Sequence, residues 1–191
     1  MDSTRKSLRS GASLMALAMA APLALPAATA HAKVVISSGA TSNMTCSGGV
    51  CTPTARDAVL NVSDLENLLA SGNVAVQSGT KPQDITAAAS LTWAPSSALT
   101  LDAYNSIAID APVSVKGMGG IALTTDDGGT TGTLGFYKKG RITFSNLSSA
   151  LTINGAAYML ARSIAALASD IANNPSGNYA LAKTYTAAGD G

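Results

Sequence analysis

Residues 99–144 read LTLDAYNSIAIDAPVSVKGMGGIALTTDDGGTTGTLGFYKKGRITF. One small unit recurs in them, consisting of two apolar residues separated by one residue of any kind and followed by turn-forming residues. Alternation with a period of two places both apolar residues on the same face of an extended strand. The Gly, Asn, Asp and Pro residues between the units are typical of tight turns. The apolar pairs are Leu99/Leu101, Ile107/Ile109, Val113/Val115, Ile121/Leu123 and Ile142/Phe144.

The pairs also recur at a longer interval. The step along the chain from Leu99 to Ile121 is almost equal to the step from Ile121 to Ile142. A nearly constant step of this length is the mark of a coiled repeat, because each unit is too short to bury its own apolar face and stacked units share one core. We therefore predict an all-β fold, a β-solenoid, with Leu99, Ile121 and Ile142 facing inward from one sheet.

Residues 1–32 have the features of a secretory signal peptide. A basic head precedes an apolar segment over residues 12–25, and Ala30-His31-Ala32 supplies a small-x-small cleavage signal. The apolar segment is shorter than the ~20 residues that a membrane span needs, Pro22 interrupts it and Pro26 follows it. We predict cleavage after Ala32 and export to the extracellular medium or the outer-membrane surface.

Cleavage would change the chemistry that the chain can perform. It would leave nine basic and ten acidic residues, and it would remove His31, the only histidine. A chain without imidazole lacks the most frequent general base and a common zinc ligand. The remaining charge gives no basic patch large enough to indicate a nucleic-acid partner. We therefore predict no catalytic residue, no cofactor, no metal ligand and no nucleic-acid binding.

Residues 33–62 are predicted to form an N-terminal cap. Lys33–Ser37 reads as a strand that pairs with or covers the first coil. Cys46 and Cys51 are separated by a short loop with two glycines, and an exported chain permits oxidation, so we predict a local disulfide. A redox pair or metal site is the alternative, but the spacing is not C-x-x-C and no histidine accompanies the cysteines.

Residues 63–191 are predicted to form the coils, with two short helices beside them. A helix is expected over residues 64–70, with Ser63 as N-cap, Glu66 completing a capping box, and a glycine after its last turn. A second helix is expected over residues 163–173, where apolar residues recur at helical spacing before Pro175. The chain closes on turn-forming residues, which leads us to expect a shortened product with an uncapped last coil.

Four residues are candidate ligand contacts, each with a structural alternative. Trp93, the only tryptophan, is either a platform on which a sugar stacks or a filler of the core. Lys138, Lys139 and Arg141 form a basic turn that either meets an acidic glycan or lipopolysaccharide or is merely solvated. The adjacent Asp126 and Asp127 are read as turn formers rather than as a catalytic pair or calcium ligands.

Three segments resemble the repeat region of filamentous-haemagglutinin-type bacterial adhesins, the exoproteins of two-partner secretion and related autotransporters. They are Leu99–Ala103, Ser106–Val113 and Gly119–Thr125, and Ser176–Leu181 resembles the strand start that precedes GLUG repeats in such proteins. The resemblance implies a right-handed parallel β-helix, export from a Gram-negative cell and a part in surface adhesion. It also makes an outer-membrane translocator an expected partner.

The resemblance and the composition together lead to a functional expectation. We expect a secreted or cell-surface adhesin-like module, without catalysis, that attaches to glycans or proteins of host or neighbouring cells. A carbohydrate-active β-helix enzyme is one alternative, and a deep groove lined by at least three close carboxylate or basic side chains would favour it. A non-functional fragment of a larger exoprotein is the other alternative.

Overall fold

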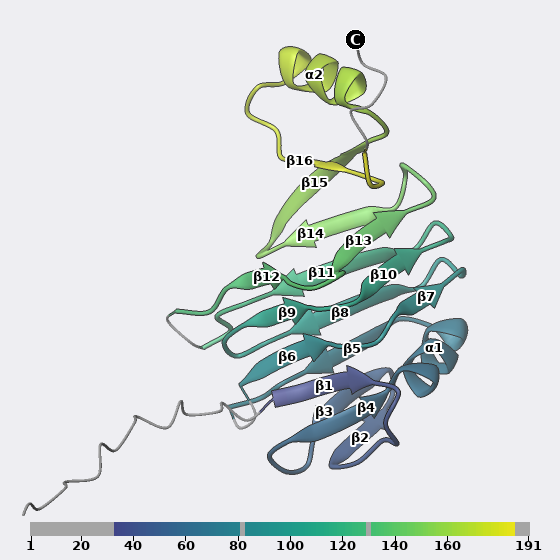
Figure 1. Cartoon of the computed structure of the whole chain (residues 1–191), viewed down its shortest axis with the longest axis vertical. Coiled ribbons are helices and arrows are strands. Elements are labelled where there is room, and N and C mark those ends of the chain that lie inside the picture. Colours follow the sequence, from purple (N-terminus) through teal and green to yellow (C-terminus); the bar gives the residue numbers. More distant parts are fainter. Residues whose placement is uncertain (1–32, 81–82, 129–130, 186–191) are drawn as a thin grey trace, which may run out of the picture.

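The computed structural model describes residues 33–80, 83–128 and 131–185. Within these residues the chain forms sixteen short strands and two helices, stacked in layers along one long axis (Figure 1). The elements are β1 (Lys33–Ser37), β2 (Met44–Ser47), β3 (Val50–Pro53), β4 (Ala58–Asn61), α1 (Val62–Ser71), β5 (Val74–Gln77), β6 (Asp84–Ala87), β7 (Leu91–Trp93), β8 (Ala98–Asp102), β9 (Ile107–Ile109), β10 (Pro112–Val115), β11 (Gly120–Thr124), β12 (Leu134–Phe136), β13 (Arg141–Phe144), β14 (Ala150–Ile153), β15 (Ala156–Ala161), α2 (Ile164–Asn173) and β16 (Tyr179–Leu181).

The strands form three sheets. The long sheet has the order β16-β15-β14-β11-β8-β5-β3-β2, the middle sheet β12-β9-β6-β1-β4, and the short sheet β13-β10-β7. From β5 to β14 the chain passes through the long, middle and short sheets in turn, and from β8 to β14 each strand pairs in parallel with the strand one winding earlier. This winding is a parallel β-helix, so the predicted all-β solenoid with two short helices is confirmed.

The inward face of the long sheet carries a ladder of aliphatic side chains. Val74, Leu99, Ile121 and Leu151 are direct partners on successive strands, and all four are buried. Side chains at paired positions of parallel strands point to the same face of the sheet, so stacking the windings aligns the alternating apolar residues. Burying one such side chain contributes about 1.5–3 kcal/mol relative to leaving it exposed.

One part of the predicted repeat is wrong. Ile142 pairs with Val113 on the short sheet, whereas the partner of Ile121 on the next winding is Leu151. The winding from Ile121 to Leu151 is therefore longer than the winding from Leu99 to Ile121. Turns between strands lie on the surface and lengthen without disturbing the stacked strands, so the period of the sequence is not constant.

The N-terminal end of the stack is closed in three different ways. β1, predicted as the first strand, lies inside the middle sheet between β4 and β6. The long sheet ends in the antiparallel hairpin β2–β3, which the predicted Cys46–Cys51 disulfide joins. In the short sheet α1 takes the place of a further strand, since it connects β4 to β5 and packs against β7. Figure 1 shows α1 and this hairpin at the same end of the stack.

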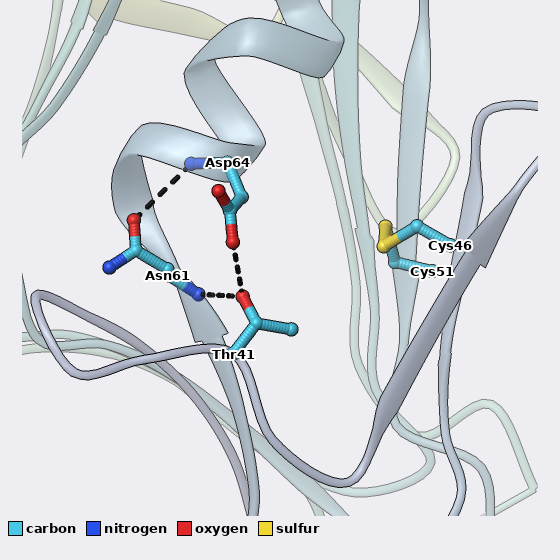
Figure 2. Close-up of a disulfide and its surroundings, with 5 residues drawn as sticks. All are labelled: Thr41, Cys46, Cys51, Asn61 and Asp64. Carbon is cyan, nitrogen blue, oxygen red and sulfur yellow. Dashed lines mark hydrogen bonds between the residues drawn. A yellow bond between two sulfur atoms is a disulfide. The ribbon is translucent and has the colours of Figure 1, made fainter.

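The predicted first helix exists, but its start is different from the prediction. The N-cap of α1 is Asn61, whose side-chain oxygen accepts hydrogen bonds from the backbone N–H groups of Ser63 and Asp64 at 2.8 and 3.3 Å. Thr41 ties this turn to the preceding loop, because its hydroxyl donates to the Asp64 carboxylate at 2.6 Å and accepts from the Asn61 N–H at 2.9 Å (Figure 2). Ser63 therefore caps nothing, and Glu66 is not part of a capping box.

The C-terminal end is covered only in part. β14 and β15 form an antiparallel hairpin, and Asn154 and Gly155 turn it with positive φ angles of 48° and 78°. The predicted second helix is α2, which begins after its N-cap, Ser163, and no residue of α2 is buried. Figure 1 places α2 beyond the end of the stack, so the expectation that each helix lies beside the coils is wrong for α2. The chain after β14 also covers part of the coil that was expected to be uncapped.

Candidate functional site

The outer face of the short sheet carries hydroxyl and basic side chains. In β10 the side chains of Val113 and Val115 are buried, so Ser114 points outward, as does Lys116 after the strand. The neighbouring Ser114 and Thr143 hydroxyls lie 3.2 Å apart within hydrogen-bond distance. A cavity of about 410 Å³ opens over them. Its lining is Ser114, Lys116, Arg141, Thr143, Phe144, Ser145, Lys183 and Thr184.

A second cavity of about 500 Å³ adjoins the first. The chain after β16 returns to the end of β13, where the Phe144 N–H donates to the Ala182 carbonyl at 2.8 Å. This contact brings Lys183 next to the short sheet. The two cavities share Phe144, Ser145 and Lys183, and we call them together the basic groove. The second cavity is lined in addition by Leu147, Arg162, Ser163 and Ala182.

The charges around the basic groove have one sign. Lys116, Arg141, Arg162 and Lys183 are all exposed, and none of them forms an ion pair within the described part of the chain. Among the described residues, the lining of the two cavities includes no carboxylate. The N-terminus of α2, at Ser163, adds the positive end of a helix dipole at the same place. The basic groove is therefore suited to attract an anion.

The structure separates the three residues of the predicted basic turn. Lys138 forms an ion pair with Asp110 at 2.5 Å, and Lys139 is exposed outside the groove. Arg141 lines the groove, and its guanidinium donates to the Lys139 carbonyl at 3.2 Å. Of the three, only Arg141 is positioned with other unpaired cations.

Sequence reasoning missed the other three basic residues of the groove. No periodic signal in the sequence marks them, because Arg141 is the partner of Pro112 and not of Lys116 in the register of β10 and β13. Arg162 and Lys183 follow two strands of the long sheet, β15 and β16, and only the folded chain brings them to the groove.

Trp93 is part of the core and is not a sugar platform. Its side chain is 4% exposed, and its indole N–H donates to the Ser97 carbonyl at 3.0 Å. A ring can stack on a sugar only where its face is open to solvent. The hypothesis of a glycan contact at Trp93 is therefore wrong, and the alternative of a core filler is confirmed.

A smaller acidic pocket lies at the C-terminal ends of β5 and β8, two neighbouring strands of the long sheet. A cavity of about 300 Å³ is lined by Gln77, Gly79, Thr80, Asp102, Tyr104 and Asp127. Burial raises the pKa of the Asp102 carboxyl, the hydrogen bond from the Gln77 amide opposes this shift, and the nearby Asp127 carboxylate adds to it. Within the described residues no group of three or more His, Cys, Asp or Glu could hold a metal ion.

Asp126 acts as a turn former, as predicted, with a φ of 59° and its carboxylate accepting from the Gly132 N–H.

A further, apolar cavity lies beneath the N-terminal hairpin. It measures about 380 Å³ and lies between β2, β4 and α1, next to the disulfide (Figure 2). Met44, Leu60 and Leu68 make most of its lining apolar, and Thr41 and Asp64 in the lining already bond to each other. Its character differs from that of the basic groove, because no basic residue lines it in the described part of the chain.

Comparison with known proteins gives no relative from which a function could be inferred. No family model matches the chain, and neither the curated proteins nor the solved structures contain a significant match. Neither of the two helices in the described residues has the length and apolar character of a membrane span.

Proposed function

We propose that this chain is an exported, adhesin-like β-helix module that attaches to surfaces through the side of its stack. The observation that carries the proposal is the basic groove, an open site on the outside of the solenoid whose cations have no ion partner among the described residues. A stack of windings presents long lateral faces, which are suited to contact with extended polymers and surfaces rather than to enclosure of a small molecule. The disulfide of the N-terminal hairpin agrees with an oxidising, extracytoplasmic location.

The outer face of the long sheet supports the same proposal. Ala75, Thr100, Ala122 and Thr152 are direct partners on successive windings and point away from the buried ladder. Small side chains of this kind make a flat surface on which many weak contacts form at once. Such a surface suits attachment better than it suits the positioning of a reactive group.

Production of the full chain in a Gram-negative host tests the proposal. We expect the protein to be recovered outside the cytoplasm with Lys33 as its first residue, and cells that make it to be retained on glycan-coated surfaces in larger numbers than vector controls. Equal retention of the two cell populations would overturn the attachment function. Recovery of the intact chain in the cytoplasm would overturn the export.

One observation favours a carbohydrate-active enzyme as a second candidate. The groove holds three basic side chains, Lys116, Arg141 and Lys183, around one cavity, which is the arrangement expected of such an enzyme. Among the residues that the structure describes, its lining lacks the pair of carboxylates that hydrolysis of a glycosidic bond ordinarily uses. Incubation of the purified chain with an acidic polysaccharide distinguishes the two functions, because only an enzyme would increase the number of chain ends over time.

A further inference from the structure

We infer that the basic groove binds an acidic polysaccharide, a sugar polymer that carries carboxylate or sulfate groups. This inference rests on the proposed function and names its ligand class. The groove is built by four separate parts of the chain, namely β10 with the residue after it, β13 with the loop after it, the residues before α2, and the residues after β16. Only the folded stack brings them together.

The charges of the groove match an anionic partner of some length. Four cations surround two joined cavities, and among the described residues the acidic side chains line other parts of the molecule, such as the acidic pocket. The two cavities extend from the outer face of β10 and β13 to the residues before α2 and after β16, and the cations are spread over both. Cations spread in this way hold several anionic groups of one polymer better than they hold one small anion.

The remaining lining of the groove favours a sugar polymer over a nucleic acid. Ser114, Thr143, Ser145 and Thr184 supply hydroxyl groups, which both donate and accept hydrogen bonds and so pair with sugar hydroxyls. Single-stranded nucleic acids bind by stacking their bases on exposed aromatic rings. The one aromatic side chain in the lining, Phe144, is buried, and no other ring lines the groove within the described residues.

The unpaired state of the cations matters as much as their number. Lys138 already has Asp110 as a partner, so binding of an anion there would have to compete with an existing ion pair. The four cations of the groove face no such competition from the described residues. An anionic polymer would therefore gain charge-assisted hydrogen bonds without breaking others.

Calorimetric titration of the purified chain with dextran sulfate, alginate and neutral dextran tests the inference. Dextran sulfate and alginate carry sulfate and carboxylate groups respectively, and neutral dextran controls for the sugar backbone. We expect binding to at least one acidic polymer and none to neutral dextran, with affinity falling as salt is raised because bound counterions are released. Absence of binding to both acidic polymers at low salt would overturn the inference.

Two double variants with equal changes of net charge locate the site. In the first, Lys116→Gln and Lys183→Gln remove two cations of the groove, and we expect affinity for the acidic polymer to fall about tenfold. In the second, Lys33→Gln and Lys139→Gln remove two exposed cations elsewhere, and we expect a change of less than about twofold. Equal losses in the two variants would show attraction by net charge alone and would overturn the inference. Urea unfolding of both variants checks that the fold is intact.

Two further outcomes separate the ligand class from the proposed function. Tighter binding to single-stranded DNA than to either polysaccharide, lost in the groove variant, would overturn the inference in favour of a nucleic-acid ligand. Retention of cells on surfaces without any binding of acidic polymers would overturn the ligand class alone. Binding of the acidic polymer without retention of cells would overturn the attachment function and leave the binding site standing.

Discussion

The Glu66 carboxylate accepts a hydrogen bond from the backbone N–H of Thr92 at 2.8 Å. Thr92 lies on β7, which pairs with β10 on one side and faces α1 on the other. A strand at the edge of a sheet presents unpaired backbone groups that can pair with another chain. Glu66 of α1 accepts the backbone hydrogen bond that a further strand of the sheet would otherwise accept. α1 therefore protects the edge of the short sheet in two ways, by covering β7 and by bonding one of its backbone N–H groups.

Glu66→Ala removes the acceptor for the Thr92 N–H. We expect the free energy of unfolding to fall by about 1 kcal/mol, because Thr92 is exposed and water replaces part of the lost hydrogen bond. Alanine is the better helix former, so helix propensity would not account for a loss. Urea unfolding measures the change. Glu66→Gln keeps a side-chain oxygen and should recover part of it, whereas equal losses in the two variants would count against this role.

The N-cap of α1 gives a second prediction. Asn61→Ala removes the acceptor of two helix N–H groups, together with bonds from the same amide to the Ser38 and Gly39 carbonyls. We expect a loss of about 1–2 kcal/mol in the free energy of unfolding. Ser63→Ala is the matched control and should change the stability by less than about 0.5 kcal/mol. A larger effect of Ser63→Ala would show that the cap lies at the serine after all.

Several features of the fold follow from local sequence patterns. Alternation such as that of Leu99 and Leu101 defines a strand and its buried face, because the period of two is a property of the backbone itself. Asn154-Gly155 and Ser163 likewise specify a hairpin turn and a helix start through bonds and angles of nearby residues. These elements were predictable because each depends on a few neighbouring residues alone.

Features that depend on the length of a winding were not predictable. Ile142 was assigned to the wrong sheet because turns of different length separate the strands, and the sequence does not say which turn is extended. The basic groove joins residues such as Lys116 and Lys183 that only the stacked windings bring together. The partner of Glu66 was hidden for the same reason, since Thr92 lies one winding further along the chain.

The last strand of the middle sheet, β12, is less well covered than β9 beside it, and a pair of side-chain truncations can measure this difference. Ile109 and Phe136 are direct partners on β9 and β12, yet Ile109 is fully buried and Phe136 is 50% exposed. We expect Ile109→Ala to lower the free energy of unfolding by about 3 kcal/mol, because it leaves a cavity among packed windings. Phe136→Ala should cost about 1 kcal/mol, since half of the ring is already in water. Equal losses in urea unfolding would show that the end over β12 is covered in solution.

The raised pKa of Asp102 predicts how stability depends on pH. Burial is the largest cause of the shift, and the Asp127 carboxylate adds to it while the amide of Gln77 opposes it. A carboxyl whose pKa is higher in the folded than in the unfolded state binds its proton more tightly when folded, so its contribution to stability is present at low pH. That contribution is lost as the pH rises from the ordinary carboxyl range of about 4 through the raised value.

The variant Asp102→Asn tests this pH dependence, because its side chain cannot ionise. Its amide can donate to Asp127 while its carbonyl accepts from Gln77. We therefore expect Asp102→Asn to have the higher urea midpoint at about pH 7 and to lose this advantage near pH 3. An advantage that persists at about pH 3, or a less stable variant at neutral pH, would contradict the assignment of this pH dependence to Asp102.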